Sequence, residues 1–289
     1  MKTLTDWLLA QRQRLVIVAI VAAPLLPILT AALLALETIR RGAAQGAMSA
    51  AFGVVGLSLL AVLSRTGVLA FALIGLASMG GGVAIGVLIR WAGNLVLGFQ
   101  VVWLVCFVAV LAFAAFGPDP AVLFAPILDD FKEALQAPPG SEAQVAEIVA
   151  RMAQTLPSAT LLFVVGGTMF LAYWWCAVAN GQPLFAVEFR QLRLGRWLGS
   201  VATLVVVLGL VFDAPLVQNL RAMAVFGFLF QGLAVTHAWV HAKQWHPGLL
   251  VLFYVLLVVP PLTIAVTVVG LVDNWLDLRK PTRSAARRE

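Results

Sequence analysis

Residues 218–280 read QNLRAMAVFGFLFQGLAVTHAWVHAKQWHPGLLVLFYVLLVVPPLTIAVTVVGLVDNWLDLRK. Two long apolar runs are joined here by a short polar hinge at residues 241–247. The second run contains Pro260 and Pro261 near its middle, and it ends in the polar pattern Gly-x-x-Asp-x-Trp-x-Asp-x-Arg at residues 270–279. A helix needs about 20 apolar residues to cross the hydrocarbon core of a bilayer. The stretch therefore predicts one transmembrane helix followed by a proline-broken membrane segment.

The composition extends this prediction to the whole chain. Of the 289 residues, 62% are hydrophobic and 11% are charged, and the mean hydropathy is +1.00. A water-soluble chain of this size could not bury so much apolar surface. The apolar residues also form long runs rather than amphipathic stripes. We therefore predict an all-α, polytopic transmembrane helix bundle that forms a single integral membrane domain over residues 1–289.

The apolar runs fall into two kinds. Six are clean spans, at residues 43–63, 67–89, 95–116, 159–179, 198–212 and 220–240. Two proline-broken segments flank them, at 15–36 and 249–272. Prolines in membrane helices commonly produce only a kink, and about 24 residues are short for two crossings. We therefore expect one kinked crossing in each broken segment, with a segment that enters and returns as the alternative.

The polar insertion at about residues 117–157 contains six acidic residues and two basic ones. Its acidic balance predicts an extracytoplasmic position. Two short helices are expected within it, the first beginning at Asp119 and the second capped by Ser141.

Basic residues orient the chain. The net charge of +6 comes from residues near span ends, which the positive-inside bias and anionic lipids explain without nucleic acid. Arg190 and its neighbours predict a cytoplasmic loop, and the basic tail at about 278–289 predicts a cytoplasmic C-terminus. One crossing in each broken segment conflicts with this arrangement, because it puts the acidic insertion inside. A segment that enters and returns satisfies every charge.

The C-terminal features resemble a known family. They are the Gln-Gly-Leu-Ala-Val step at 231–235, Trp245 two residues before Pro247, the Pro-Pro break and the Gly-x-x-Asp-x-Trp-x-Asp-x-Arg ending. Over about the last 70 residues the chain resembles the YybS-like family of uncharacterised polytopic bacterial membrane proteins, and the rest resembles it only generally. That family is distantly similar to the S components of energy-coupling-factor vitamin transporters. The resemblance implies a substrate-binding component in the bacterial cytoplasmic (inner) membrane, working with a separate energising module.

Sequence patterns for catalysis are absent. The chain has no Walker A loop, His-Glu-x-x-His, Gly-x-Ser-x-Gly or pair of cysteines at metal spacing. We therefore expect no enzyme activity, no catalytic residue, no cofactor and no metal. Cys106 and Cys176 lie in apolar runs and are expected to be small core residues. His237 and His241 share a helix face and could ligate a metal, but an interfacial belt of aromatic and histidine side chains is favoured.

Polar residues within apolar runs are costly in a membrane and therefore informative. Tyr173, Trp174, Asn180 and Gln231 form the ligand-site hypothesis. Their aromatic faces suit a planar small molecule, and their amides suit its polar edge. The alternative, which we favour, is an interfacial aromatic belt with hydrogen bonds between helices.

The segment around Arg190, Arg193 and Arg196 alternates basic and apolar residues. It predicts a short stretch on the inner leaflet, with the arginines at lipid phosphates and Phe189, Leu192 and Trp197 pointing into the membrane. A docking surface for a cytoplasmic partner is the other interpretation.

Glycines recur at helical spacing in the second and third apolar runs, as in Gly82-x-x-x-Gly86. Small residues let membrane helices approach closely, so internal packing is expected, with docking of a partner as the alternative. The triplet at residues 80–82 is expected to loosen its helix.

Two functions therefore stay open. The resemblance implies an S-component-like, membrane-embedded part of a vitamin or small-molecule uptake system. The alternative is a non-transporting membrane scaffold or assembly factor for envelope or division processes. The lipid bilayer is a partner in both cases, with an energising transporter module or another membrane protein beside it.

Overall fold

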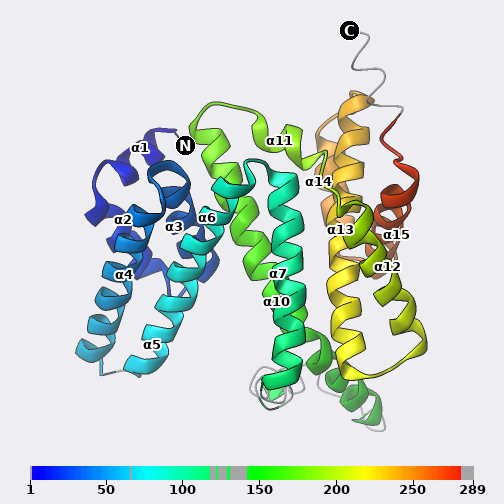
Figure 1. Cartoon of the computed structure of the whole chain (residues 1–289), viewed down its shortest axis with the longest axis horizontal. Helices are drawn as coiled ribbons and strands as arrows, with labels where there is room; N and C mark the ends of the chain where they lie inside the picture. The colour runs from blue at the N-terminus through cyan, green and yellow to red at the C-terminus, as the bar shows by residue number, and fades with distance from the viewer. Residues whose placement is uncertain (1, 66, 118–121, 123–128, 131–141, 281–289) are drawn as a thin grey trace. The chain divides into compact units, whose positions relative to one another are not determined.

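The computed structural model describes residues 2–65, 67–117, 122, 129–130 and 142–280 (Figure 1). Every regular element in these ranges is a helix, which confirms the predicted all-α class. Five of the helices found there are long and apolar enough to cross a membrane, and a bent pair provides up to a sixth crossing. The chain is a multi-pass membrane protein.

The chain divides into two compact units. Unit 1 comprises Met1–Phe99 and Val164–Phe189, and unit 2 comprises Gln100–Phe163 and Arg190–Glu289. Unit 1 contains α1 (Lys2–Ala10), α2 (Arg12–Ala22), α3 (Pro27–Arg41), α4 (Ala43–Leu63), α5 (Val68–Gly75), the π-helix η1 (Leu76–Gly80), α6 (Gly81–Ala92) and α11 (Leu184–Phe189). Unit 2 contains α12 (Gly195–Val211), α13 (Pro215–Ala242), α14 (Gly248–Leu256) and α15 (Pro260–Leu276). Both units take part of α7 (Leu95–Phe116) and of α10 (Glu142–Ala179).

Five of the six predicted clean spans lie in helices long enough to cross a membrane, whereas the span at 198–212 becomes α12, which has only 17 residues. α4 and α7 have the predicted bounds, whereas α13 begins at Pro215 because proline fits the first turn of a helix. The main correction is α10, a single helix of 38 residues that joins the predicted second insertion helix to the predicted span at 159–179. Strong helix formers on both sides of Pro157 continue the helix, since an interior proline can kink a helix without ending it. Asp119, Ser141 and the tail after Lys280 lie outside the described residues.

The first proline-broken segment forms two helices rather than one. α2 ends at Ala22 and α3 begins at Pro27. Glu37 on α3 directly follows the broken segment predicted at 15–36, and its side chain is fully buried. Its Oε1 lies 3.6 Å from Nη1 of Arg41. No described residue donates a hydrogen bond to this carboxylate.

Glycines pack α6 against α3 in unit 1. A Cβ at Gly82 would lie 2.2 Å from the carbonyl oxygen of Ala31, and one at Gly86 would lie 2.8 Å from that of Ala35. The predicted packing role of Gly82-x-x-x-Gly86 is confirmed, because only glycine permits this approach. Just before Gly81, the helix widens into the π-helical turn η1 instead of unwinding.

The second proline-broken segment bends by 112° between α14 and α15. The segment is therefore two helices, and the bend is compatible with both expected arrangements, a single broken crossing and a segment that enters and returns. The break falls at Val259, which takes an extended conformation before Pro260. A residue before proline is sterically disfavoured from the helical region, and two prolines in succession supply no N–H donors.

The C-terminal end of α15 is held to the basic segment that precedes α12. Arg279 donates hydrogen bonds to the carbonyls of Arg190 (2.7 Å) and Leu192 (3.1 Å). In Figure 1, the C-terminal ends of α13 and α15 both lie toward the upper end of unit 2. Arg279, at the start of the predicted basic tail, thus lies beside the basic segment that precedes α12.

We predict that the N-terminal part of α10 is extracytoplasmic, because its segment is acidic. In a Cys106→Ala/Cys176→Ala background, Gln144→Cys should react with an impermeant maleimide on intact spheroplasts, since Gln144 is exposed. Arg196→Cys, on the basic side, is the matched control and should react only after lysis. Labelling of Arg196→Cys and protection of Gln144→Cys in intact spheroplasts would reverse the orientation.

Candidate functional site

The residues of the C-terminal motif form a buried polar network in unit 2. Arg279 makes a bidentate pair with Asp273, with Nη2 2.6 Å from Oδ2 and Nε 3.2 Å from Oδ1. Both residues are 1% exposed. Asp277 adopts a left-handed conformation at the end of α15 and turns the chain so that Arg279 folds back onto Asp273. The C-terminal motif thus anchors the chain after α15, because Arg279 binds Asp273 within the helix.

Gln231, a predicted ligand residue, belongs to this network. Its Nε2 donates to Oδ2 of Asp273 at 2.8 Å, and its Oε1 accepts from the backbone N–H of Leu194 at 3.0 Å. The side chain is fully buried. Both ends of the amide are therefore used in joining α13 to α15 and to the start of α12.

The other three predicted ligand residues belong to unit 1. The hydroxyl of Tyr173 donates to Oε2 of Glu188 at 2.7 Å. Oδ1 of Asn180 accepts a hydrogen bond of 2.7 Å from Arg40, and Trp174 is partly exposed. The polar groups of Tyr173 and Asn180 thus have partners within unit 1. The hypothesis that these residues and Gln231 bind a ligand stays a prediction.

The predicted inner-leaflet segment differs in detail from the expectation. Phe189 and Leu192 are buried within the protein rather than turned toward lipid. Arg193 makes an ion pair of 3.1 Å with Asp277. Burial lowers the pKa of Arg190 from its ordinary value. Arg196 is exposed, so it alone of the three arginines keeps the expected open position for lipid or a partner.

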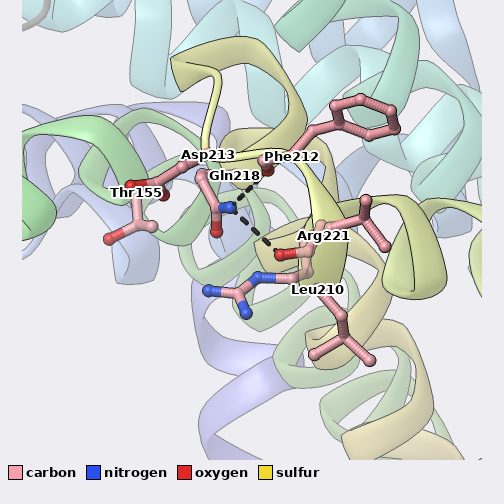
Figure 2. Close-up of a pocket in the computed structure, with 8 residues that line it drawn as sticks. Thr155, Leu210, Phe212, Asp213, Gln218 and Arg221 are labelled. Atoms are coloured by element: carbon pink, nitrogen blue, oxygen red, sulfur yellow. Dashed lines mark hydrogen bonds between the residues drawn. The ribbon is translucent and has the colours of Figure 1, made fainter.

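A pocket of about 300 Å³ lies in unit 2 where α12 ends and α13 begins (Figure 2). It is lined by Thr155 of α10, residues 209–213, Gln218 and Arg221. Gln218 shapes one wall, since its Nε2 donates to the carbonyls of Gly209 (3.1 Å) and Phe212 (2.9 Å). These bonds hold the link between α12 and α13 against the first turn of α13.

Ser158 fixes α10 beside this pocket. Its hydroxyl lies 2.7 Å from Oδ1 and 3.0 Å from the backbone carbonyl of Asn219, and both residues are buried. Thr155 lies one turn before Ser158 on the same helix. The pocket is therefore built from three helices that are joined by buried hydrogen bonds.

Arg221 supplies the positive charge of the pocket. Its aliphatic stem lies across Gly209, where a Cβ would come within 2.4 Å of Cδ of Arg221. The guanidinium makes no hydrogen bond or ion pair with any residue that the structure describes. A cation at a membrane span is costly unless it is paired or solvated. Arg221 is thus suited to bind an anionic group.

Gln218, Arg221 and Asp213 were not among the residues selected from the sequence for a ligand site. A signal was present, because Arg221 and Asp213 are the only charged residues between positions 198 and 240. Asp213 directly follows the predicted span at 198–212 and Arg221 lies at the start of the predicted span at 220–240, so the two charges can belong to one polar site. That interpretation depends on a hairpin between the spans, which brings positions 213 and 221 to one pocket.

The described residues contain no group of three or more histidine, cysteine, aspartate or glutamate side chains that could hold a metal. Nε2 of His237 lies 2.8 Å from the hydroxyl of Tyr254, and the two rings are neighbours. No protein-family model, curated protein or solved structure matches this chain.

Proposed function

We propose that this membrane protein binds a small molecule with an anionic group in the pocket at Arg221. In this role it resembles a membrane-embedded, substrate-binding component of a bacterial uptake system, with an energising module supplied by another protein. The observation that carries the proposal is a guanidinium that pairs with none of the described residues, at a pocket of about 300 Å³. Ligand pockets have volumes of about 300–1,000 Å³ and contain a few polar groups that orient the ligand.

The surroundings of Arg221 favour binding over a purely structural role. A structural arginine in this chain has its donors occupied, as Arg279 does with Asp273 and two backbone carbonyls. Gln218 is rigidly held, so the pocket is formed before a ligand arrives. Preformed polar groups lower the cost of ordering on binding.

The test uses full-length protein in nanodiscs. Molecules that remain bound during purification are identified by mass spectrometry, and the affinity of the recovered molecule is then measured for wild type and Arg221→Gln. Loss of a charge-assisted hydrogen bond costs about 1.5–3 kcal/mol, so we expect binding to weaken by roughly 10- to 150-fold. Arg196→Gln, outside the pocket, is the matched control and should bind as wild type does.

The scaffold alternative predicts a different result. A scaffold would co-purify with protein partners, and Arg221→Gln would leave those partners in place. Absence of a bound anionic molecule from wild type, or equal binding by Arg221→Gln, would contradict the proposed function.

A further inference from the structure

A second charge lies in the same pocket. Asp213 lines it from the link between α12 and α13, and no ion pair joins its carboxylate to Arg221 or to another described residue. Two opposite charges that share a pocket without pairing can each bind a separate group of one ligand. From this arrangement we infer that the ligand is a small zwitterion, with its anionic group at Arg221 and an ammonium group at Asp213. The inference rests on the function proposed above.

The backbone at Asp213 also favours a cation. α12 ends at Val211, so the negative end of its dipole faces this part of the pocket. The carbonyls of Leu210 and Val211 accept no hydrogen bond from any residue that the structure describes. An ammonium group has three donors and no acceptor. The Asp213 carboxylate supplies acceptors for such donors from the lining of the pocket.

The two halves of the pocket are held apart by Gln218. Its Nε2 is committed to the carbonyls of Gly209 and Phe212, which fixes the side chain in the wall (Figure 2). Arg221 is likewise fixed by the contact of its stem with Gly209. Asp213 and Arg221 are thus kept as separate binding points, and a molecule with one charge would satisfy only one of them.

The size of the pocket limits the ligand. A volume of about 300 Å³ equals roughly ten water molecules at about 30 Å³ each. Groups of the phosphoethanolamine or amino-acid type fit within this volume and carry both charges. Such a group has two sources, a free solute or the headgroup of a membrane lipid.

The first arm of the test uses a free solute. Full-length protein is placed in nanodiscs of phosphatidylglycerol, which contain no zwitterionic lipid, and O-phosphoethanolamine and glycerol 3-phosphate are titrated by calorimetry. We expect O-phosphoethanolamine to bind at least about tenfold more tightly, because only it supplies the ammonium group. Asp213→Asn should remove this preference, and Arg221→Gln should weaken both probes. Asp130→Asn and Arg196→Gln, outside the pocket, should change neither, and equal melting temperatures check folding.

The second arm uses the lipid. Protein is reconstituted with equal amounts of phosphatidylethanolamine and phosphatidylglycerol, and retained lipid is identified by native mass spectrometry. The ligand is a lipid headgroup if wild type preferentially retains phosphatidylethanolamine, Asp213→Asn does not, and the free probe does not bind. Binding of the free probe identifies a solute. Either result supports a zwitterion.

Two results overturn the inference in different ways. If anionic and zwitterionic probes bind equally, and Asp213→Asn changes nothing while Arg221→Gln weakens both, the ligand is an anion and only the zwitterion is wrong. If Arg221→Gln has no effect on any probe or lipid, the proposed function fails as well.

Discussion

Replacing Asp273 with alanine is expected to destabilise the protein by about 3–5 kcal/mol, because Arg279 would keep its charge in a buried site without its anionic partner. Both side chains are at most 1% exposed, and Gln231 would lose its acceptor in the same step. The free energy of unfolding can be measured by steric trapping in bicelles. The same variant should loosen the tail, so that protease cleaves after Asp277 more rapidly.

A matched control is the neighbouring ion pair of Arg193 with Asp277, whose side chains are 33% and 21% exposed. Pairs with such access to solvent contribute about 0–1 kcal/mol. Asp277→Asn keeps a residue that tolerates the positive φ of this position, so the control tests charge alone. The double variant Asp273→Leu/Arg279→Leu should be less destabilised than the sum of its single variants. A loss of under 1 kcal/mol in Asp273→Ala would contradict the role of the buried pair.

Alanine at Gly270 is expected to destabilise unit 2 by about 3 kcal/mol, since overpacking costs about 1–3 kcal/mol and backbone atoms cannot move aside as a side chain would. A Cβ at Gly270 would lie 1.9 Å from the carbonyl oxygen of Phe228 and 2.7 Å from the backbone N of Gly232. α13 and α15 would have to separate, and the bond from Gln231 to Asp273 would be strained. The expected result is a lower free energy of unfolding and faster protease cleavage after Asp277.

Gly166 provides the control for this substitution. It lies in helix α10, and a Cβ there would meet no atom within 4 Å. Gly166→Ala should leave stability unchanged or raise it by up to about 1 kcal/mol, because alanine has the higher helix propensity. Equal effects at Gly166 and Gly270 would show that helix propensity, and not close approach of backbones, governs both positions.

Much of the secondary structure could be predicted from the sequence. The bounds of α4 and α7 follow from uninterrupted apolar runs between polar or glycine-containing ends. The packing role of Gly82 and Gly86 followed from their spacing, since helix geometry places residues four apart on one face. α10 was the exception. Proline commonly ends a helix, so the sequence predicted a break at Pro157, whereas the helix formers around it continue the helix.

The candidate site was harder to predict. Gln231 was selected as a polar residue in an apolar run, yet such a residue can bind a ligand or join two helices. Its contact with Asp273, 42 positions further along the chain, decides that its amide is used internally. Arg221 and Asp213 were visible as isolated charges, but their shared pocket depends on the α12–α13 hairpin.

The membrane class, the helical periodicity and most helix bounds can be predicted from the sequence, because they depend on local composition and on backbone hydrogen bonds within one segment. Which charges are buried, paired or open to a ligand depends instead on how the helices pack together. Glu37 and Arg279 follow apolar runs in the sequence and are buried in the fold, while Arg221 has no hydrogen bond or ion pair with the described part of the chain. The energy of a charge depends on burial and on partners within a few ångströms, and folding brings those partners from distant parts of the chain.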